Sequence, residues 1–243
     1  MREHRIFVEA ELLAGAALTL PQAACHHLLV VLRAKVGQPL ILCNNTGVEA
    51  IAAIEQLDKK SAVARIQSVE TIERESPLKI HLAIGISRGE RMEFVLQKST
   101  ELGASAITPL WCERTEVKLD DARLQKKMQH WQQIILNACE QCGRTRLPVL
   151  HAPQRVHDFT SGDINELRFV LHHRSAHALP HARHKPVSVS LLIGPEGGLS
   201  EAEISSATQA GFSPLTLGPR VLRTETAPLV ALSLLQCRWG DLS

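Results

Sequence analysis

The sequence predicts an α/β protein in two parts: a small β-barrel that ends near residue 73, and a larger domain with a mainly parallel sheet from residue 74 onwards. The first part holds short runs rich in Val, Ile and Ala that are separated by Gly and Asn turns, a pattern typical of small barrels. The second part alternates apolar runs with helical stretches, which favours strand–helix–strand units. The polar stretch between them, 69–77, ends in Pro77 and is typical of a linker.

The elements expected in the first part are four strands and one helix. The strands follow the apolar runs, at 5–8, 39–43, 48–54 and 61–69. The helix is expected at 21–32, between the first two strands. Several short strands with a single inserted helix favour a small barrel.

The elements of the second part begin directly after the linker. Strands are expected at 78–86, 105–110, 149–150, 168–171, 187–193 and 214–217, and helices at 90–102, 120–142 and 224–239. Gly103 and Gly143 follow the first two helices, where glycine commonly ends a helix. A further helix is expected to begin at Ser200, with Glu203 completing a capping box, and Thr224 is available as N-cap of the last helix.

The composition excludes some classes of function. Of the 243 residues, 44% are hydrophobic, which excludes wholesale disorder. Aromatic residues make up only 3%, with no Tyr, so a module that stacks bases on a row of aromatic rings is disfavoured. Residues 74–155 hold 13 Lys and Arg against 9 Asp and Glu (13 − 9 = +4), while the segments on either side are each −1. A local basic region suits a polyanion such as RNA; the alternative is a solvated helix face with paired charges.

Cysteine usage and the start of the chain predict where the protein works. Six scattered Cys are not a disulfide framework, and they favour free thiols in a reducing compartment. The first residues lack the apolar stretch of a signal peptide, and no apolar run approaches the roughly 18 residues that span a bilayer. We therefore expect a cytoplasmic protein with no membrane partner.

Two Gly-Pro loops carry the strongest functional signal. The apolar run 191–193 leads into Gly194-Pro195-Glu196-Gly197-Gly198, and Leu217 leads into Gly218-Pro219-Arg220. In both cases a strand ends in a turn that opens a helix, and open α/β sheets bind ligands at the carboxyl ends of their strands. The first loop matches neither the dinucleotide nor the P-loop fingerprint. A structural turn is the alternative for the first loop, where Glu196 favours a ligand contact. For the second loop the alternative is an N-capped helix with an ion pair of Arg223 and Glu225.

Three other patterns have both a functional and a structural interpretation. Lys98 and Glu101 share a helix face, as part of a site or as a plain i,i+3 ion pair. Cys139 and Cys142 form a C-x-x-C, but no second pair and no finger-spaced His follow, so redox or zinc chemistry is disfavoured. The loop at 172–186 lacks carboxylates to support a specific metal site, although it holds five histidines: His172, His173, His177, His181 and His184.

Five motifs resemble those of one family, in the same order along the chain. They are Ser-Arg-Gly-Glu-Arg-Met-Glu-Phe (87–94), Gln-Lys-Ser-Thr-Glu-Leu-Gly (97–103), Ala-Cys-Glu-Gln-Cys-Gly-Arg (138–144), Leu-Ile-Gly-Pro-Glu-Gly-Gly (192–198) and Gly-Pro-Arg-Val-Leu-Arg-Thr-Glu-Thr-Ala (218–227). The segments 5–8 and 27–33 fit as well. By these motifs the chain resembles, over essentially its whole length, the ribosomal RNA small subunit methyltransferase E family, bacterial enzymes that methylate N3 of one uridine in 16S rRNA.

The resemblance implies a fold, a cofactor and partners. It implies a PUA-like, RNA-binding β-barrel at 1–73 and a SPOUT methyltransferase domain at 74–243. SPOUT domains form a deep trefoil knot, bind S-adenosylmethionine and act as homodimers. The implied partner is 16S rRNA of the small ribosomal subunit. A knot is an exception to the usual chain-threading rules, so periodicity alone does not predict one.

The resemblance also implies site residues, carried over motif by motif. The cofactor-binding set is Leu171, His172, Gly194, Glu196, Gly198, Leu217, Gly218, Val221, Leu222 and Arg223. The RNA-binding set is Arg5, His27, Arg33, Arg88, Lys98, Glu101, Arg114, Glu140, Gln141 and Arg144. For catalysis we expect a carboxylate, either Glu225 or Glu196, to take the N3 proton, and Arg223 to stabilise the developing uracil anion. No metal is expected.

Three alternatives stand beside this interpretation. A SPOUT enzyme with another RNA target, such as a tRNA ribose 2′-OH, is disfavoured by the N-terminal barrel and by the motifs at 97–103 and 138–144. A non-catalytic RNA-binding or ribosome-assembly factor would bind no S-adenosylmethionine. A redox or metal protein built on Cys139 and Cys142 would carry a metal or a reactive thiol after purification.

Overall fold

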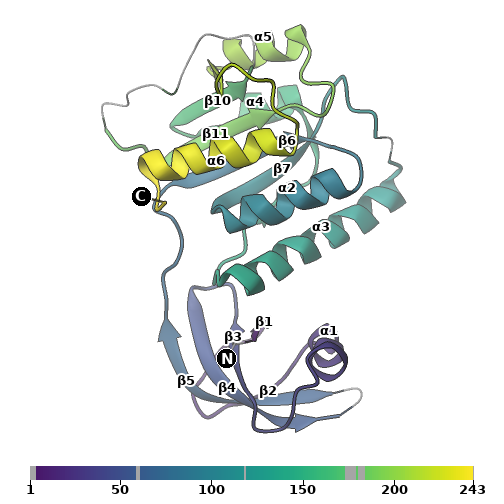
Figure 1. The fold of residues 1–243 in the computed structure, drawn as a ribbon, viewed down its shortest axis with the longest axis vertical. Helices are drawn as coiled ribbons and strands as arrows, with labels where there is room; N and C mark the ends of the chain where they lie inside the picture. The colour runs from purple at the N-terminus through teal and green to yellow at the C-terminus, as the bar shows by residue number, and fades with distance from the viewer. Residues whose placement is uncertain (1–3, 59–60, 118, 173–178, 180–183, 243) are drawn as a thin grey trace. The chain divides into compact units, whose positions relative to one another are not determined.

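A computed structural model describes residues 4–58, 61–117, 119–172, 179 and 184–242 (Figure 1). The chain divides into two compact units, which we describe separately. The first contains Met1–Glu75 and Cys139–Leu147, and the second contains Ser76–Ala138 and Pro148–Ser243. The division between residues 75 and 76 falls within the polar stretch 69–77. The sequence did not indicate that residues 139–147 return to the first unit, because residues 139–142 are the last turn of a helix that begins in the second.

The first unit is built on a five-stranded sheet with the order β1-β3-β4-β5-β2. β1 (Arg5–Phe7) pairs in parallel with β3 (Pro39–Cys43), and the remaining pairs, among β3, β4 (Val48–Leu57), β5 (Ala62–Thr71) and β2 (Ala17–Thr19), are antiparallel. The four expected strands are present near their expected bounds. The sequence missed β2, since three residues are too few to show an alternation.

The helix expected at 21–32 is present as two segments. α1 (Gln22–His26) runs into a π-helical turn, η1 (His27–Val31). Arg33 then takes a φ of 49°, in the left-handed region that side chains with a Cβ seldom adopt. His27 and Arg33, both in the predicted RNA-binding set, are exposed at this turn.

The second unit contains a seven-stranded sheet in the order β12-β10-β11-β6-β7-β8, with β9 also paired to β7. Its strands are β6 (Lys79–Gly85), β7 (Ala104–Trp111), β8 (Val149–Leu150), β9 (Gln154–Arg155), β10 (Leu167–Leu171), β11 (Ser188–Ile193) and β12 (Ser213–Leu215). Every strand pair that the described residues form in this sheet is parallel. The predicted α/β fold with a mainly parallel sheet is therefore confirmed, and the carboxyl ends of its strands share one edge.

Helices pack on both faces of this sheet (Figure 1). α2 (Glu90–Glu101), α3 (Asp121–Cys142) and α6 (Thr226–Trp239) pack on one face, and α4 (Val156–Gly162) and α5 (Glu201–Gln209) on the other. Consecutive side chains of a strand point to opposite faces, and accordingly Leu82 of β6 joins the first core and Ala83 the second. α2 buries Met92, Leu96 and Thr100 at helical spacing.

The helix starts and ends test the sequence prediction most closely. The capping box of α5 is present, because Ser200 Oγ accepts from the N–H of Glu203 (3.1 Å) while Glu203 Oε2 accepts from the N–H of Ser200 (2.8 Å).

The sequence missed α4 and β9, which are short. Most of the His-rich loop 172–186 lies outside the described residues. Among the helices that the structure describes, none combines the length and apolarity needed to cross a membrane.

Candidate active site

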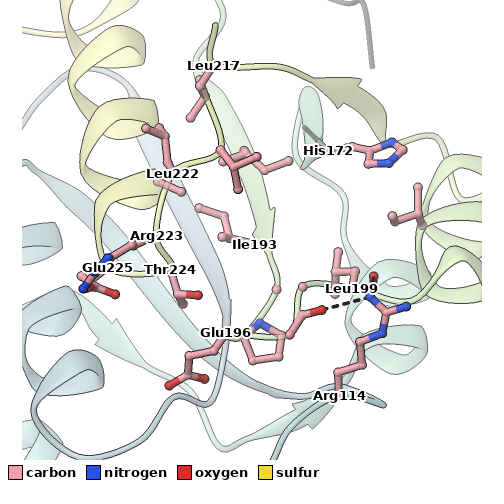
Figure 2. A pocket seen from close by; sticks show the side chains of 18 of the residues that line it. Arg114, His172, Ile193, Glu196, Leu199, Leu217, Leu222, Arg223, Thr224 and Glu225 are labelled. Atoms are coloured by element: carbon pink, nitrogen blue, oxygen red, sulfur yellow. Dashed lines mark hydrogen bonds and ion pairs between the residues drawn. The ribbon is translucent and has the colours of Figure 1, made fainter. Parts of the chain in front are cut away.

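A pocket of about 610 Å³ opens in the second unit at the carboxyl ends of β10, β11 and β12. Two loops form its walls, residues 194–199 after β11 (the first loop) and 216–225 after β12 (the second loop) (Figure 2). The side chains between them include Ile193, Leu199, Leu217 and Leu222. Charged side chains line the rest of the pocket, so it combines aliphatic with polar walls. A concave site at the carboxyl ends of parallel strands is the usual place for a small ligand.

The first loop turns so tightly that it needs glycine. A Cβ at Gly194 would lie 2.5 Å from the backbone N of Leu199, so the loop closes on itself only without a side chain there. Gly198 takes a φ of 69°, and its N–H donates to the carbonyl of Pro195 (2.8 Å). Gly85, which ends β6, is equally close, since a Cβ there would lie 2.3 Å from the backbone N of Pro195. The loop therefore packs directly on the sheet.

The carboxylate of the first loop, Glu196, accepts hydrogen bonds from α2 and from the segment that precedes this helix. Its Oε1 accepts from the backbone N–H of Arg88 (3.1 Å) and from Arg91 Nη1 (3.2 Å). Partial burial raises the pKa of Glu196, but hydrogen bonds from its own N–H and that of Arg88, together with Arg91, outweigh that effect and hold the pKa below its ordinary value. Arg91 was absent from the predicted set, although it lies in the motif at 87–94.

A second arginine, Arg114 in the segment that follows β7, also contacts the first loop. Arg114 Nη1 donates to the carbonyls of Gly197 (3.0 Å) and Leu199 (3.3 Å). The next residue back in the chain, Glu113, donates its N–H to Glu203 Oε1 (2.9 Å). Arg114 belongs to the predicted RNA-binding set. The structure shows that it also lines the pocket.

The second loop carries the other polar groups. Arg223 Nη1 lies 3.9 Å from Glu225 Oε1, with side chains that are 80% and 21% exposed. The expected N-cap at Thr224 is wrong: the N-cap position of α6 is Glu225, and no side chain caps it. The reason is local, since the N–H groups of Thr226 and Ala227 both donate to the carbonyl of Arg223 (2.9 Å each). Thr224 lines the pocket (Figure 2).

The end of β10 forms a third side of the pocket, beside the two loops. The N–H of His172 donates to the carbonyl of Leu215 (3.0 Å), and Thr216 Oγ1 donates to the carbonyl of His172 (3.0 Å). The pocket thus brings together all ten residues of the predicted cofactor-binding set together with Glu225. The residues that the pocket adds to these sets include Arg91, Ile193, Leu199, Leu215 and Thr224.

Other members of the predicted RNA-binding set in the second unit are paired with carboxylates at the surface. Arg88 Nη2 lies 2.8 Å from Glu116 Oε2. Lys98 Nζ bonds both carboxylate oxygens of Glu101, at 2.8 and 2.9 Å, which is the i,i+3 pair that the spacing allowed. The Arg88 pair is exposed, and exposed pairs contribute little to stability. The Lys98–Glu101 pair is half-buried.

In the first unit, three residues of the predicted RNA-binding set have partners within the protein. Arg5 pairs with the buried Glu49, and Arg144 pairs with Glu75, with both members nearly buried. Glu140 accepts from the N–H of Phe7 (3.1 Å). Burial explains these partners, because a charge removed from water needs an opposite charge or hydrogen bonds. Gln141 is exposed.

The C-x-x-C cysteines are arranged as two neighbours on one helix. Cys139 is buried and Cys142 is exposed, and Cys142 Sγ bonds the carbonyl of Cys139 (3.8 Å). Burial raises the pKa of the Cys139 thiol to about 12, which keeps it in the unreactive thiol form.

Comparisons with known proteins agree with this geometry. A family profile described as "RNA methyltransferase domain" matches residues 74–236, and one described as "RNA methyltransferase PUA domain" matches residues 20–67. The fold and the pocket therefore define an RNA methyltransferase.

The curated relatives narrow this class. The ribosomal RNA small subunit methyltransferase E of Buchnera aphidicola subsp. Schizaphis graminum is 36% identical over 240 residues, which cover 98% of each chain. The Bacillus subtilis protein of that name is 34% identical over 226 residues, 86% of this chain and 85% of the relative. The chain belongs to the ribosomal RNA small subunit methyltransferase E family, as its five motifs predicted.

Two solved structures match over the full length of both chains. A methyltransferase from Legionella pneumophila, in complex with bound SAM, is 48% identical with a TM-score of 0.97. A ribosomal RNA small subunit methyltransferase E from Neisseria gonorrhoeae, bound to S-adenosyl methionine, is 37% identical with a TM-score of 0.93.

Proposed function

We propose that this chain transfers the methyl group of S-adenosylmethionine to N3 of a specific uridine in 16S rRNA of the small ribosomal subunit. The observation that carries the proposal is the pocket, where two Gly-Pro loops converge at the carboxyl ends of β11 and β12. Full-length relatives of the same fold were crystallised with this cofactor. The small-subunit substrate follows from the family name, and the uridine N3 from the family that the motifs resemble.

The pocket fits the cofactor chemically. Aliphatic walls such as Leu199, Leu217 and Leu222 suit an adenine ring, and exposed backbone groups of the two loops suit its hydrogen-bonding edge. When bound, the cofactor supplies an activated methyl group on a sulfonium. The residues of this chain then have to hold the acceptor nitrogen in line with that methyl group, and positioning of this kind supplies a large part of a rate enhancement.

Removal of the N3 proton calls for a carboxylate, and the two candidates differ in their surroundings. Glu196 is bound by an arginine and a backbone N–H that lower its pKa, which makes it a weak proton acceptor. Glu225 has Arg223 at 3.9 Å and lines the same pocket. We therefore assign the base role to Glu225 and the stabilisation of the uracil anion to Arg223.

The target base has to leave its stack to reach this pocket. With few aromatic residues in the chain, the uracil is held by aliphatic side chains, loop backbone and arginine. We propose that residues 1–73 serve as the RNA-binding part and that residues 74–243 form the knotted methyltransferase domain. We further propose a homodimer, as the family that the motifs resemble implies.

A methyl-transfer assay tests the proposal. Purified protein, labelled S-adenosylmethionine and either free 16S rRNA or small subunits from a strain that lacks this activity should give N3-methyluridine after digestion to nucleosides. Label in another nucleoside would refute the N3 assignment. If calorimetry detects no binding of S-adenosylmethionine, the ribosome-assembly factor becomes the better interpretation.

A further inference from the structure

Single hydrogen bonds orient two peptide groups of the first loop. The N–H of Gly198 donates to the carbonyl of Pro195, and because a peptide group is planar this bond also orients the carbonyl of Gly197. The N–H of Ser200 donates to Glu203, which orients the carbonyl of Leu199 in the same way. Gly197 and Gly198 have no Cβ, so the backbone between these two bonds rotates at little steric cost. A wall that presents backbone groups to a ligand needs those groups held in one orientation before the ligand arrives.

Arg114 holds these two carbonyls. Its Nη1 donates to Gly197 at 3.0 Å and to Leu199 at 3.3 Å, and Figure 2 shows the guanidinium beside Leu199, away from Arg223 and Glu225 in this view. The stem of Arg114 also fills the space above Gly197, where an added Cβ would lie 3.0 Å from Arg114 Cβ. The arginine therefore holds both carbonyls from outside the loop and leaves little room for a side chain at Gly197.

The segment that carries Arg114 is itself held. The N–H of Thr115 donates to the carbonyl of Cys112, and the N–H of Cys112 bonds Thr115 Oγ1, both at 3.0 Å. The N–H of Glu113 bonds Glu203, the residue that completes the capping box of α5. The segment 112–115 is thus bonded both to the first loop and to the helix that follows it.

We propose that Arg114 is a positioning residue for the cofactor, acting through the carbonyls of Gly197 and Leu199, and not a contact to the RNA backbone. This inference rests on the proposed function, because it assigns the first loop to S-adenosylmethionine. It assigns Arg114 a different role from Arg88, whose guanidinium pairs only with an exposed carboxylate among the described contacts.

Two variants separate the two roles. Arg114→Ala removes both hydrogen bonds, and Arg114→Lys keeps the charge on a side chain one bond shorter than Nη1, without the planar fork. In both variants the Kd for S-adenosylmethionine, measured by calorimetry, should rise about tenfold or more. The salt dependence of 16S rRNA binding should keep its wild-type slope in both, because no phosphate contact is lost.

An RNA-backbone role gives the opposite pattern. Arg114→Ala would then lower the salt slope by about 1, Arg114→Lys would retain it, and the Kd for S-adenosylmethionine would match wild type; that result overturns the inference. Arg123→Ala is the matched control, an exposed arginine of the same region that pairs with Asp120, and it should alter neither quantity. Failure of the wild-type protein to bind S-adenosylmethionine would refute the proposed function itself, which distinguishes the two failures.

Discussion

The two loops of the pocket resemble each other in sequence but differ in how they are held. Both follow a parallel strand and both contain Gly-Pro. In the first loop a side chain on Gly194 would meet backbone at 2.5 Å, whereas at Gly218 of the second loop it would meet nothing within 4 Å. Arginines bind the first loop from two sides, while in the second Arg223 and Val221 are 80% and 75% exposed.

This difference assigns the loops different tasks. A loop that is packed on the sheet and bonded to neighbouring segments is preorganised, and preorganised backbone binds a small ligand at a lower entropic cost. A loop with an exposed arginine suits a partner that carries phosphates, such as RNA. We infer that the first loop is the rigid part of the cofactor site, and that the second loop contacts the cofactor with Leu217 and Leu222 while its exposed side chains meet the RNA and its target base.

The largest expected contrast comes from one alanine in each loop. Gly194→Ala forces backbone apart, so it should abolish detectable binding of S-adenosylmethionine and lower the free energy of unfolding by about 1–3 kcal/mol. Gly218→Ala only strains a φ of 85°, which costs about 1–2 kcal/mol, and should weaken binding a few-fold. Calorimetry and chemical denaturation measure both. If both variants lost S-adenosylmethionine binding to the same extent, the inferred difference between the two loops would be wrong.

The next effect separates chemistry from cofactor binding. Arg223→Ala should lower the single-turnover rate of methyl transfer about 100-fold, as loss of one charge-stabilising group does. The Kd for S-adenosylmethionine should change much less, because the first loop is intact. Glu225→Gln should show the same split if Glu225 is the base. A near-normal rate in both variants would exclude this pair from catalysis.

Acid pH should act on the first loop through Glu196. Its pKa in the folded protein is below the ordinary value of 4.5, so its hydrogen bonds stabilise the loop above that pH and are lost as the pH falls through the folded pKa. Binding of S-adenosylmethionine should therefore be constant from pH 8 to about 5 and weaken below 4.5. Glu196→Gln should remove this acid limb. Glu225→Gln, which leaves Glu196 intact, should keep it.

The smallest effect is expected at the exposed tip of the second loop. Arg220 lines the pocket mouth and is exposed. Arg220→Ala should reduce the salt slope of RNA binding by about 1 and leave the Kd for S-adenosylmethionine within twofold. Filter binding at several salt concentrations measures the slope. A changed Kd for S-adenosylmethionine with an unchanged salt slope would show that Arg220 contacts the cofactor and not the RNA, which would contradict this account.

The sequence predicted the structural features that depend on residues close together in the chain. The Ser200–Glu203 capping box, the parallel strands and both Gly-Pro turns could be read from the chain, because their spacing is set by helix and strand geometry. The expected cap at Thr224 failed because the first N–H groups of α6 bond the carbonyl of Arg223, a backbone solution that composition does not reveal.

Long-range partners could not be predicted in this way. The pairing of Arg144 with Glu75 joins residues 69 apart in sequence, and the bond from Arg114 to Gly197 joins residues 83 apart. Each of these arginines looked like part of one basic region when only charge was counted. Tertiary structure decides which of them faces a carbonyl, a buried carboxylate or solvent.

The most direct test is mass spectrometry of 16S rRNA from a strain that lacks this gene. N3-methyluridine should be missing from the small subunit, and it should return when the intact chain is supplied but not when Gly194→Ala is supplied. Undiminished N3-methyluridine in the deletion strain would contradict the proposed activity.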